Sequence, residues 1–583
     1  MKNRLNKFMI LAMCLSIGLF SCKKETDTPP SNPGTIVNPG KTIVTSIGGI
    51  IVDENDDAVA GATVTIGSNT KQTDARGLFM FNDIPVNELK AYVKVEKNGY
   101  FLCSRNVSTK INTVSSVRIT MLSNSPVGNF SAAAGGIITS DGVTLDFPLN
   151  SVKMEDGTAY TGTVNVALQF LDPNNTSLLD QMPGDLTAIN SNGDERALET
   201  YGMVAVELTS TAGQKLNVAD GKKVEITIPL SGAYLTDAPS TMPLWFFDEA
   251  NGVWKEEGLA TKVGNNYVGE VSHFTFWNFD WPNPFTFISG KVECDTVAST
   301  GALVLVKNSA GRVMGADYTD NMGNYNIRVP QGMALDMEIS QPGTCNLIPY
   351  YTSSIGSFSS TTTLATISAC SGTLNTSVIS ATLQDCNGNP VTNGVLEVQN
   401  GVHTSYFFPN SSGVVNASLI YCSATSVTVV AHDFTNFKSS IPQPVSTGAT
   451  MSIGVLSLCN TAINEYINYT LDGTAFSMLN SPGDSLSIYQ TGNITQLRCV
   501  NYATTPFKEV FFSANGASVG TFATTDISVN SLSSSTPSVN VSFTAYGTTI
   551  GAFITGTFSG TFVDNNASTT HTISGSFNLK RDF

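Results

Sequence analysis

The chain has 583 residues, a formal charge of −16 and 13% charged residues, which is about half the share usual in soluble proteins. After residue 21 the longest basic runs are pairs, namely Lys23-Lys24, Lys222-Lys223 and Lys580-Arg581. Nucleic acid is therefore not expected as a partner, because phosphate binding needs clusters of Lys and Arg. The length predicts several domains.

Residues 1–21 have the form of an export signal, with three cationic residues before an apolar run from Phe8 to Phe20. The run is too short to span a bilayer comfortably. Its ending, Leu19-Phe20-Ser21-Cys22, resembles the bacterial lipobox. The resemblance implies cleavage before Cys22 and lipidation of its sulfur. We expect an outer-membrane lipoprotein exposed at the cell surface, with the membrane as partner through Cys22. An ordinary secretory signal is the alternative.

Residues 22–43 are rich in Pro, Ser and Thr and predict an extended tether. Beyond the tether, the sequence predicts β-strands. Apolar residues alternate with polar or small ones along 164–170, 224–228 and 539–543, which indicates strands with one buried face. Gly, Asn, Asp and Pro punctuate the strands, as in sandwiches. The predicted fold class is all-β, a multi-domain chain of β-sandwiches.

A repeat defines three predicted sandwiches, at 44–122, 286–371 and 372–459. Thr73-Asp74-Ala-Arg-Gly77 is followed by Phe79, and Thr319-Asp320-Asn-Met-Gly323 is followed by Tyr325. The third copy is degenerate, with Asn410, Gly413 and Val415 at the matching places. Asp in such a turn accepts backbone N–H bonds and Gly takes positive φ.

These repeats resemble the carboxypeptidase-regulatory-like domain, a transthyretin-like β-sandwich. In carboxypeptidases that domain accompanies a zinc-bearing catalytic domain. Here none of the four His begins an HxxE or HExxH pattern. The resemblance therefore implies a spacer or binding module without peptidase activity.

Residues 125–285 form a different predicted domain that contains all four Trp. The segments 198–208, 243–258 and 271–282 together resemble a β-domain of the cartilage intermediate layer protein type, related to those of ankyrins and netrin receptors. Trp245 and Phe247 are expected on one face of a strand, and Asn251-Gly252 is expected to form a hairpin turn. The aromatic residues then predict a sandwich core.

The step His273-Phe274-Thr275 is the sharpest candidate for chemistry. In one branch of the ankyrin-like class, a similar step cuts itself. The resemblance implies that the Thr275 hydroxyl attacks the Phe274 carbonyl with His273 as general base. The other interpretation is a structural His at a strand end, packed on Trp277. The structural role is preferred, because the step supplies a nucleophile and a base but not the strain that cleavage needs.

Six cysteines repeat in register and are disulfide candidates: Cys294, Cys345, Cys370, Cys386, Cys422 and Cys459. Each segment holds three, so either one thiol stays free in each or a bond crosses between segments. No CxxC spacing occurs and no His lies beside a Cys, so neither a metal nor a cofactor is expected.

Residues 460–583 predict a last β-domain. With no catalytic constellation in the sequence, we expect a non-catalytic protein that acts in adhesion or ligand capture, with a glycan or protein as ligand. A structural envelope scaffold and a self-cleaving protein cut between Phe274 and Thr275 are the alternatives.

Overall fold

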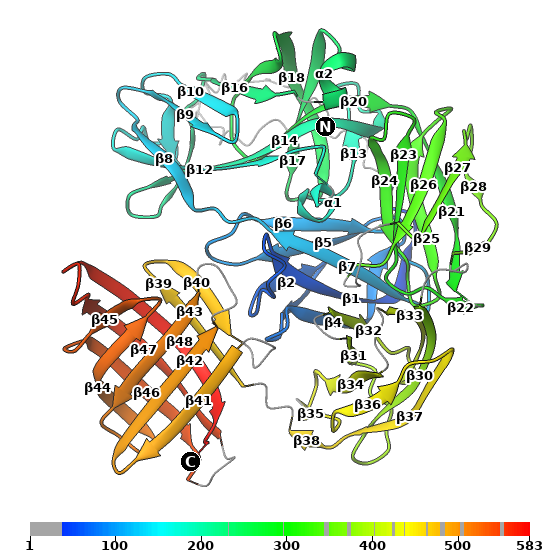
Figure 1. Cartoon of the computed structure of the whole chain (residues 1–583). Helices are drawn as coiled ribbons and strands as arrows, with labels where there is room; N and C mark the ends of the chain where they lie inside the picture. Colours follow the sequence, from blue (N-terminus) through cyan, green and yellow to red (C-terminus); the bar gives the residue numbers. More distant parts are fainter. Residues whose placement is uncertain are drawn as a thin grey trace, which may run out of the picture.

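The computed structural model describes residues 38–582 except 176, 231, 295, 343–348, 370–374, 401–402, 422–425, 437, 462–464, 479–483, 502–506 and 549–552. The strands form five groups, with the first sandwich at the centre (Figure 1). The helices of the described part are two short ones, α1 (Leu178–Gln181) and α2 (Gly232–Asp237). The predicted all-β class is confirmed.

The first sandwich packs a three-stranded sheet, β4-β1-β7, against a four-stranded sheet, β3-β2-β5-β6. The long strand β1 pairs antiparallel with β4 and parallel with β7. Its strands are β1 (Thr42–Asp53), β2 (Thr63–Ile66), β3 (Asn69–Gln72), β4 (Leu78–Asn87), β5 (Ala91–Glu96), β6 (Cys103–Val107) and β7 (Val114–Met121). The first strand thus begins inside the stretch 22–43 that was predicted as tether.

The second sandwich repeats this topology. Its central strand β21 pairs antiparallel with β25 and parallel with β28 and β29, and β24-β23-β26-β27 forms the facing sheet. Its strands are β21 (Phe285–Cys294), β22 (Val297–Ala298), β23 (Leu303–Asn308), β24 (Val313–Tyr318), β25 (Asn324–Pro330), β26 (Leu335–Ser340), β27 (Tyr351–Gly356), β28 (Thr362–Thr363) and β29 (Ile367–Ser368).

The third sandwich has the same plan, with β30 antiparallel to β33 and parallel to β37. Its strands are β30 (Asn375–Asp385), β31 (Gly394–Asn400), β32 (His403–Phe407), β33 (Val414–Tyr421), β34 (Ser426–Asp433), β35 (Lys438–Ser439), β36 (Gln443–Ser446), β37 (Thr450–Leu458) and β38 (Asn460–Thr461). Because β38 pairs with β35, residues 460–461 belong to this sandwich rather than to the last domain.

The repeated turn has one geometry in all three sandwiches. The side chain of Asp74 accepts hydrogen bonds from two backbone N–H groups, and those of Asp320 and Asn410 do the same. Gly77 has φ 72°, and a Cβ there would lie 2.2 Å from the Ile51 carbonyl oxygen. Gly is required because the turn needs positive φ and the backbone approaches closely.

The Trp-rich domain is one hydrogen-bonded sheet of 13 strands that curls round its own core. Its strands are β8 (Pro126–Ser131), β9 (Gly136–Ser140), β10 (Val143–Phe147), β11 (Val152–Met154), β12 (Thr163–Leu171), β13 (Thr187–Ile189), β14 (Glu195–Ser210), β15 (Lys215–Val218), β16 (Val224–Pro229), β17 (Thr241–Asp248), β18 (Val253–Val263), β19 (Asn266–Val271) and β20 (Phe276–Asn283).

Aromatic side chains fill this domain as the sequence predicts. Trp245 and Phe247 are both fully buried on β17. The Asp248 side chain accepts N–H bonds from the following turn, where Gly252 has positive φ, and β18 returns antiparallel to β17. Trp281 differs from the other Trp residues, because 42% of its surface is exposed.

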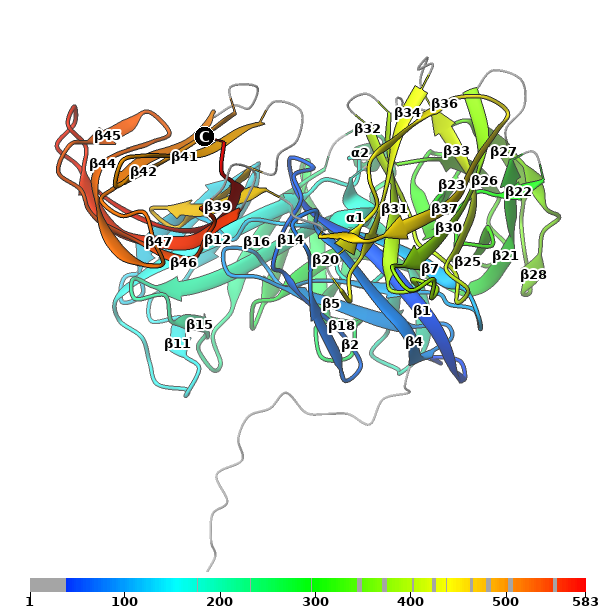
Figure 2. The ribbon, with the colours of Figure 1, turned by 90° about the horizontal axis from the view of Figure 1, so that it is seen from below.

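The C-terminal domain is a ten-stranded antiparallel sheet that also curls round a core of its own (Figure 2). The end strand β41 forms a bridge to Arg581, the residue that follows β48, so the sheet curls back on itself. The strands are β39 (Tyr466–Leu471), β40 (Thr474–Met478), β41 (Asp484–Thr491), β42 (Ile494–Asn501), β43 (Lys508–Ala514), β44 (Gly520–Val529), β45 (Leu532–Ser534), β46 (Ser538–Tyr546), β47 (Phe553–Val563) and β48 (Thr570–Lys580).

Apolar clusters cross the borders between the first four domains. Phe101 and Leu122 of the first sandwich share a cluster with Trp254 of the Trp-rich domain, and Leu303 of the second sandwich packs against it. Leu78 of the first sandwich lies in another cluster with buried residues of the third. The three sandwiches and the Trp-rich domain therefore form an interlocked block.

Candidate functional site

The candidate functional region is the set of buried polar junctions that join the interlocked block. At the first junction, Arg105 of β6 donates a hydrogen bond to the Leu179 carbonyl of α1. Arg118 of β7 lies 3.4 Å from Asp180 of α1, whose carboxylate also accepts a hydrogen bond from Tyr318 of β24 at 2.9 Å. Three domains thus meet at one carboxylate, 17% of whose side chain is exposed.

Burial dominates the electrostatics at this three-domain junction. It raises the pKa of Asp180, although the charges of Arg105 and Arg118 act in the opposite direction. It also raises the pKa of Asp317 to about 8, although the carboxylate accepts a hydrogen bond from the Asn326 N–H at 2.9 Å. A cavity of about 60 Å³ lies beside Arg105 and Asp317, large enough for water and too small for a substrate.

The second junction joins the Trp-rich domain to the second sandwich through Arg312. Its guanidinium donates to Glu199 and to the Tyr201 hydroxyl, each at 2.9 Å, and pairs with Asp237 at 2.9 Å. The cation also lies 4.8 Å from the ring centroid of Tyr234. Arg312 is 5% exposed and Glu199 is 7% exposed, so each charge depends on the other for compensation.

The third junction joins the first and third sandwiches. Arg76 pairs with Asp74 in its own turn at 2.6 Å and with Glu397 of β31 at 3.3 Å, and His432 of β34 contacts Glu397 at 3.0 Å. Burial alone would raise the pKa of Glu397, but the His432 hydrogen bond and the Arg76 charge lower it to about 2. Burial lowers the pKa of His432, although Glu397 opposes that shift.

The sequence reasoning missed these junction residues, although a signal was present. Arg76 occupies a variable position of the first Thr-Asp-x-x-Gly turn. In the second turn the corresponding stretch contains Asn321, which exchanges hydrogen bonds of 2.9 Å with the backbone of Val114 in the first sandwich. The fixed residues of the motif make the turn, and the variable ones contact the neighbouring domain.

His273 lies in a corner of the Trp-rich domain. Its ring packs on Trp277, with centroids 5.1 Å apart, and its Nε2 lies 3.4 Å from Glu257. The Thr275 hydroxyl donates to the Phe276 carbonyl at 3.0 Å, and the Phe274 N–H donates to the Asn217 side chain. The ring of His273 thus contacts both Glu257 and Trp277.

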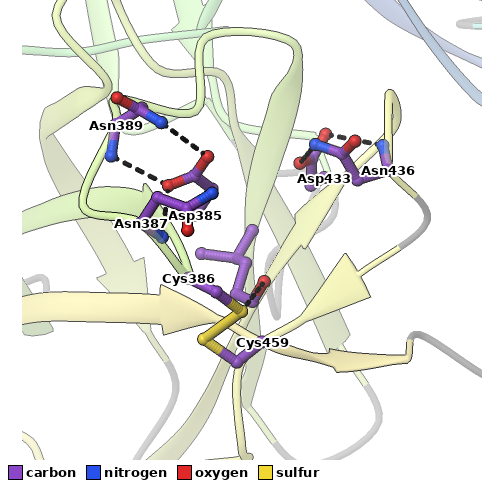
Figure 3. The surroundings of a disulfide bond; sticks show 8 residues. Asp385, Cys386, Asn387, Asn389, Asp433, Asn436 and Cys459 are labelled. Atoms are coloured by element: carbon purple, nitrogen blue, oxygen red, sulfur yellow. Dashed lines mark hydrogen bonds between the residues drawn. A yellow bond between two sulfur atoms is a disulfide. The ribbon is translucent and has the colours of Figure 1, made fainter.

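Cys386 and Cys459 form a disulfide with Cα atoms 5.1 Å apart (Figure 3). Cys386 belongs to a turn in which the Asp385 side chain accepts the N–H groups of Asn387 and Asn389, each at 2.8 Å. The bond joins the ends of β30 and β37, which are parallel neighbours. It therefore closes within one sandwich.

Cys294 is also disulfide-bonded. The remaining candidates, Cys345, Cys370 and Cys422, lie outside the described residues, as does the lipidation candidate Cys22. The described residues contain no group of three or more His, Cys, Asp or Glu that could hold a metal ion. No helix in the described ranges has the length and apolar character needed to cross a bilayer.

No protein-family profile matches the chain. The cartilage intermediate layer protein 1 of Sus scrofa is 36% identical over 115 residues, which cover 20% of this chain and 19% of that protein. Its counterpart in Homo sapiens is 33% identical over 115 residues, which cover 10% of its length. The predicted likeness to this protein type is confirmed over that part of the chain, and the match spans a small share of these relatives.

Among solved structures, the chain is similar to the shaft pilin SpaA from Lactobacillus rhamnosus GG. The match has 8% identity and a TM-score of 0.16, and it covers 30% of this chain and 97% of the pilin. The major pilin subunit BcpA of Bacillus cereus gives 10% identity and a TM-score of 0.11, with 72% and 100% covered. Scores this low carry no argument about function. The chain is a β-sandwich protein, and about a fifth of it is similar in sequence to cartilage intermediate layer proteins.

Proposed function

We propose that this chain is a non-catalytic, lipid-anchored protein of the cell envelope that acts in adhesion or ligand capture. The observation that carries the proposal is the interlocked block, in which charged side chains such as Arg312 are buried between domains. Such junctions hold the modules in fixed relative positions, because separating them would leave buried charges unpaired. If residues 22–43 act as the predicted tether, this fixed body would be held away from the membrane with its loops accessible to ligands.

The predicted anchor supports the same function. Each buried CH₂ of an acyl chain contributes about 0.8 kcal/mol, so two or more chains on Cys22 would hold the protein on a membrane. Cys14 lies in the apolar run of the same signal and provides a matched control.

Membrane fractionation and mass spectrometry of the mature protein test the anchor. The wild type and Cys14→Ala are expected in the membrane fraction with acyl mass on Cys22. Cys22→Ala is expected in the soluble fraction. Equal partition of all three proteins would contradict lipid anchoring.

Attachment of intact cells tests adhesion. Cells that carry the chain are expected to bind members of a panel of matrix proteins and glycans, and cells without it are expected to lose that binding. Loss of binding after protease treatment of whole cells would place the block on the outer surface. Binding that is the same with and without the chain would contradict the adhesive role.

A structural envelope scaffold is the second candidate, and the same interlocked block favours it. Pull-down from intact membranes separates the two candidates. A scaffold is expected to retain other envelope proteins at fixed ratios, and an adhesin is expected to come down alone.

Self-cleavage between Phe274 and Thr275 receives little support from the contacts of His273 with Glu257 and Trp277. A denaturing gel tests it directly. One intact band is expected in the wild type and in Thr275→Val. A pair of fragments that vanishes in Thr275→Val would establish cleavage.

A further inference from the structure

A large groove lies between the first sandwich and the C-terminal domain. Its volume is about 970 Å³, within the range of clefts that hold small ligands. One wall is the outer face of strands β39, β48 and β47, and the other is the turn after β1 together with Lys97 and Tyr100. The groove is separate from the buried junctions of the interlocked block.

Hydroxyl and amide side chains form a regular grid on the C-terminal wall. Each strand contributes alternate residues to this face, while the intervening residues, such as Ile467 and Phe577, are buried in the core. Strand pairing places the grid residues in two rows across the three strands. The rows are Asn468-Ser576-Thr557 and Thr470-Ser574-Ser559.

The grid is held in place by its own contacts. The hydroxyls of Thr470 and Ser574 lie 2.7 Å apart across neighbouring strands, and the Ser477 hydroxyl donates to the Asn468 side chain at 2.6 Å. Ser and Thr hydroxyls each offer one donor and two acceptor positions. The strands therefore hold several such groups at fixed spacing. A ligand with many hydroxyls can form hydrogen bonds to them without the entropic cost of ordering the side chains first.

The charged groups of the groove already have partners. Lys97 donates to the Ala60 carbonyl at 2.7 Å, and Lys508 donates to the Ser477 carbonyl at 3.3 Å and lies 3.5 Å from Asp57. The Asp53 side chain accepts two backbone N–H bonds of its turn. An ionic ligand would have to displace these contacts, so the groove favours an uncharged one.

One aromatic side chain adds apolar area to the lining. Tyr100 lies on the first-sandwich wall, whereas Phe476 of β40 pairs with Tyr469 and stacks on its buried ring, on the core side of the sheet. Aromatic faces provide apolar area at low cost in side-chain entropy. A sugar ring offers hydroxyls at its rim and C–H groups on its faces, which matches hydroxyl side chains combined with the ring of Tyr100.

We propose that the groove between the first sandwich and the C-terminal domain binds an uncharged oligosaccharide through the hydroxyl grid. The proposal rests on the adhesive function above and names the ligand class. It assigns the contact to the face of β39, β48 and β47 rather than to loop tips.

The test uses the purified full chain and two variants on one sheet. Ser574→Arg places a long cation in the middle of the grid. Thr521→Arg makes the same change at an exposed position of β44, outside the groove lining. Both positions are exposed on strands, so the two variants should fold alike, and calorimetry of unfolding checks that they do.

Isothermal titration uses uncharged hexasaccharides of glucose, galactose, mannose and N-acetylglucosamine as probes. At least one is expected to bind the wild type and Thr521→Arg equally and to bind Ser574→Arg at least tenfold more weakly. Binding that Ser574→Arg leaves unchanged would overturn the proposal. So would a lack of binding by every probe, or capture of a peptide or matrix protein alone.

The same variants separate this inference from the proposed function. Cells that carry Ser574→Arg and still attach to the panel through this chain would overturn the saccharide groove and leave the adhesive role standing. Cells that fail to attach even with the wild type would contradict the proposed function itself.

Discussion

The first sandwich and the C-terminal domain are both built of β-strands round an apolar core, yet they are joined to the rest of the molecule differently. The first sandwich shares apolar clusters with its neighbours and contributes Arg76, Arg105 and Arg118 to buried junctions. The core of the C-terminal domain consists of residues from that domain. Its charged contact with the first sandwich is Lys508 with Asp57, at 3.5 Å and with Asp57 half-exposed.

The difference shows that similar β-modules can be fused or left nearly independent by a few side chains. Burying an arginine between two modules makes separation costly, because the partner carboxylate would remain desolvated and unpaired. A partly exposed ion pair contributes about 0–1 kcal/mol. We therefore expect two unfolding transitions, one for the interlocked block and one for the C-terminal domain, and four experiments can break or sharpen that division.

The largest effect is expected from Phe512→Ala in the C-terminal core. Phe512 is fully buried, with its ring centroid 5.5 Å from that of Phe558. The cavity should cost about 4 kcal/mol. Differential scanning calorimetry should show that only the transition of the C-terminal domain falls. An equal fall in both transitions would mean that the domain does not unfold independently.

Arg312→Ala should destabilise the block by about 3 kcal/mol, because Glu199 loses its compensating charge while buried. The figure is at the lower end for buried pairs because Asp237 remains accessible to water. The matched control is Lys223→Ala, whose pair with Glu270 is exposed on both sides. The control should leave both transitions in place. An unchanged block in Arg312→Ala would show that the junction does not hold the domains together.

Acid should weaken the junction of Arg76, Glu397 and His432 by about 3 kcal/mol. Because the pKa of His432 is lowered in the folded protein, His432 is protonated more readily in the unfolded chain. The free energy of unfolding therefore falls as the pH drops below 6.5. The pKa of Glu397 is lowered to about 2 in the folded protein, so between pH 4.5 and 2 the unfolded chain is protonated at Glu397 before the folded one. The free energy of unfolding falls further in that range. Denaturant titrations across this range should show the block losing stability, and Glu397→Gln should flatten the lower part of the profile.

The control for this pH profile is Glu270→Gln, which changes an exposed carboxylate and should leave the profile unaltered. A profile that is as steep in Glu397→Gln as in the wild type below pH 4.5 would assign the acid sensitivity to other groups.

The smallest effect is expected from Lys508→Ala. The pair with Asp57 should contribute less than about 1 kcal/mol, so neither calorimetric transition should move by more than about four degrees. A large shift in either transition would show that the C-terminal domain is docked firmly on the first sandwich.

Local patterns gave correct predictions where the physics is local. Asp74 and Gly77 make their turn through bonds within a few residues, so even the degenerate copy with Asn410 was recognisable. Trp245 and Phe247 share a face because strand side chains alternate. The sequence placed the start of the last domain at residue 460, but Asn460 and Thr461 pair with β35 of the third sandwich. No sequence pattern indicates this pairing of β38 with β35.

The amino-acid sequence by itself determined that this protein is built of strands, where most turns fall and which residues fill each core, because those features depend on near neighbours and on a period of two. Only the tertiary structure decided which modules are joined. Arg76 reaches Glu397 across 321 positions, and Arg312 reaches Glu199 across 113. Such pairs form when two folded surfaces come together and exclude water. The free energy of this association depends on both surfaces, so neither sequence segment alone predicts it.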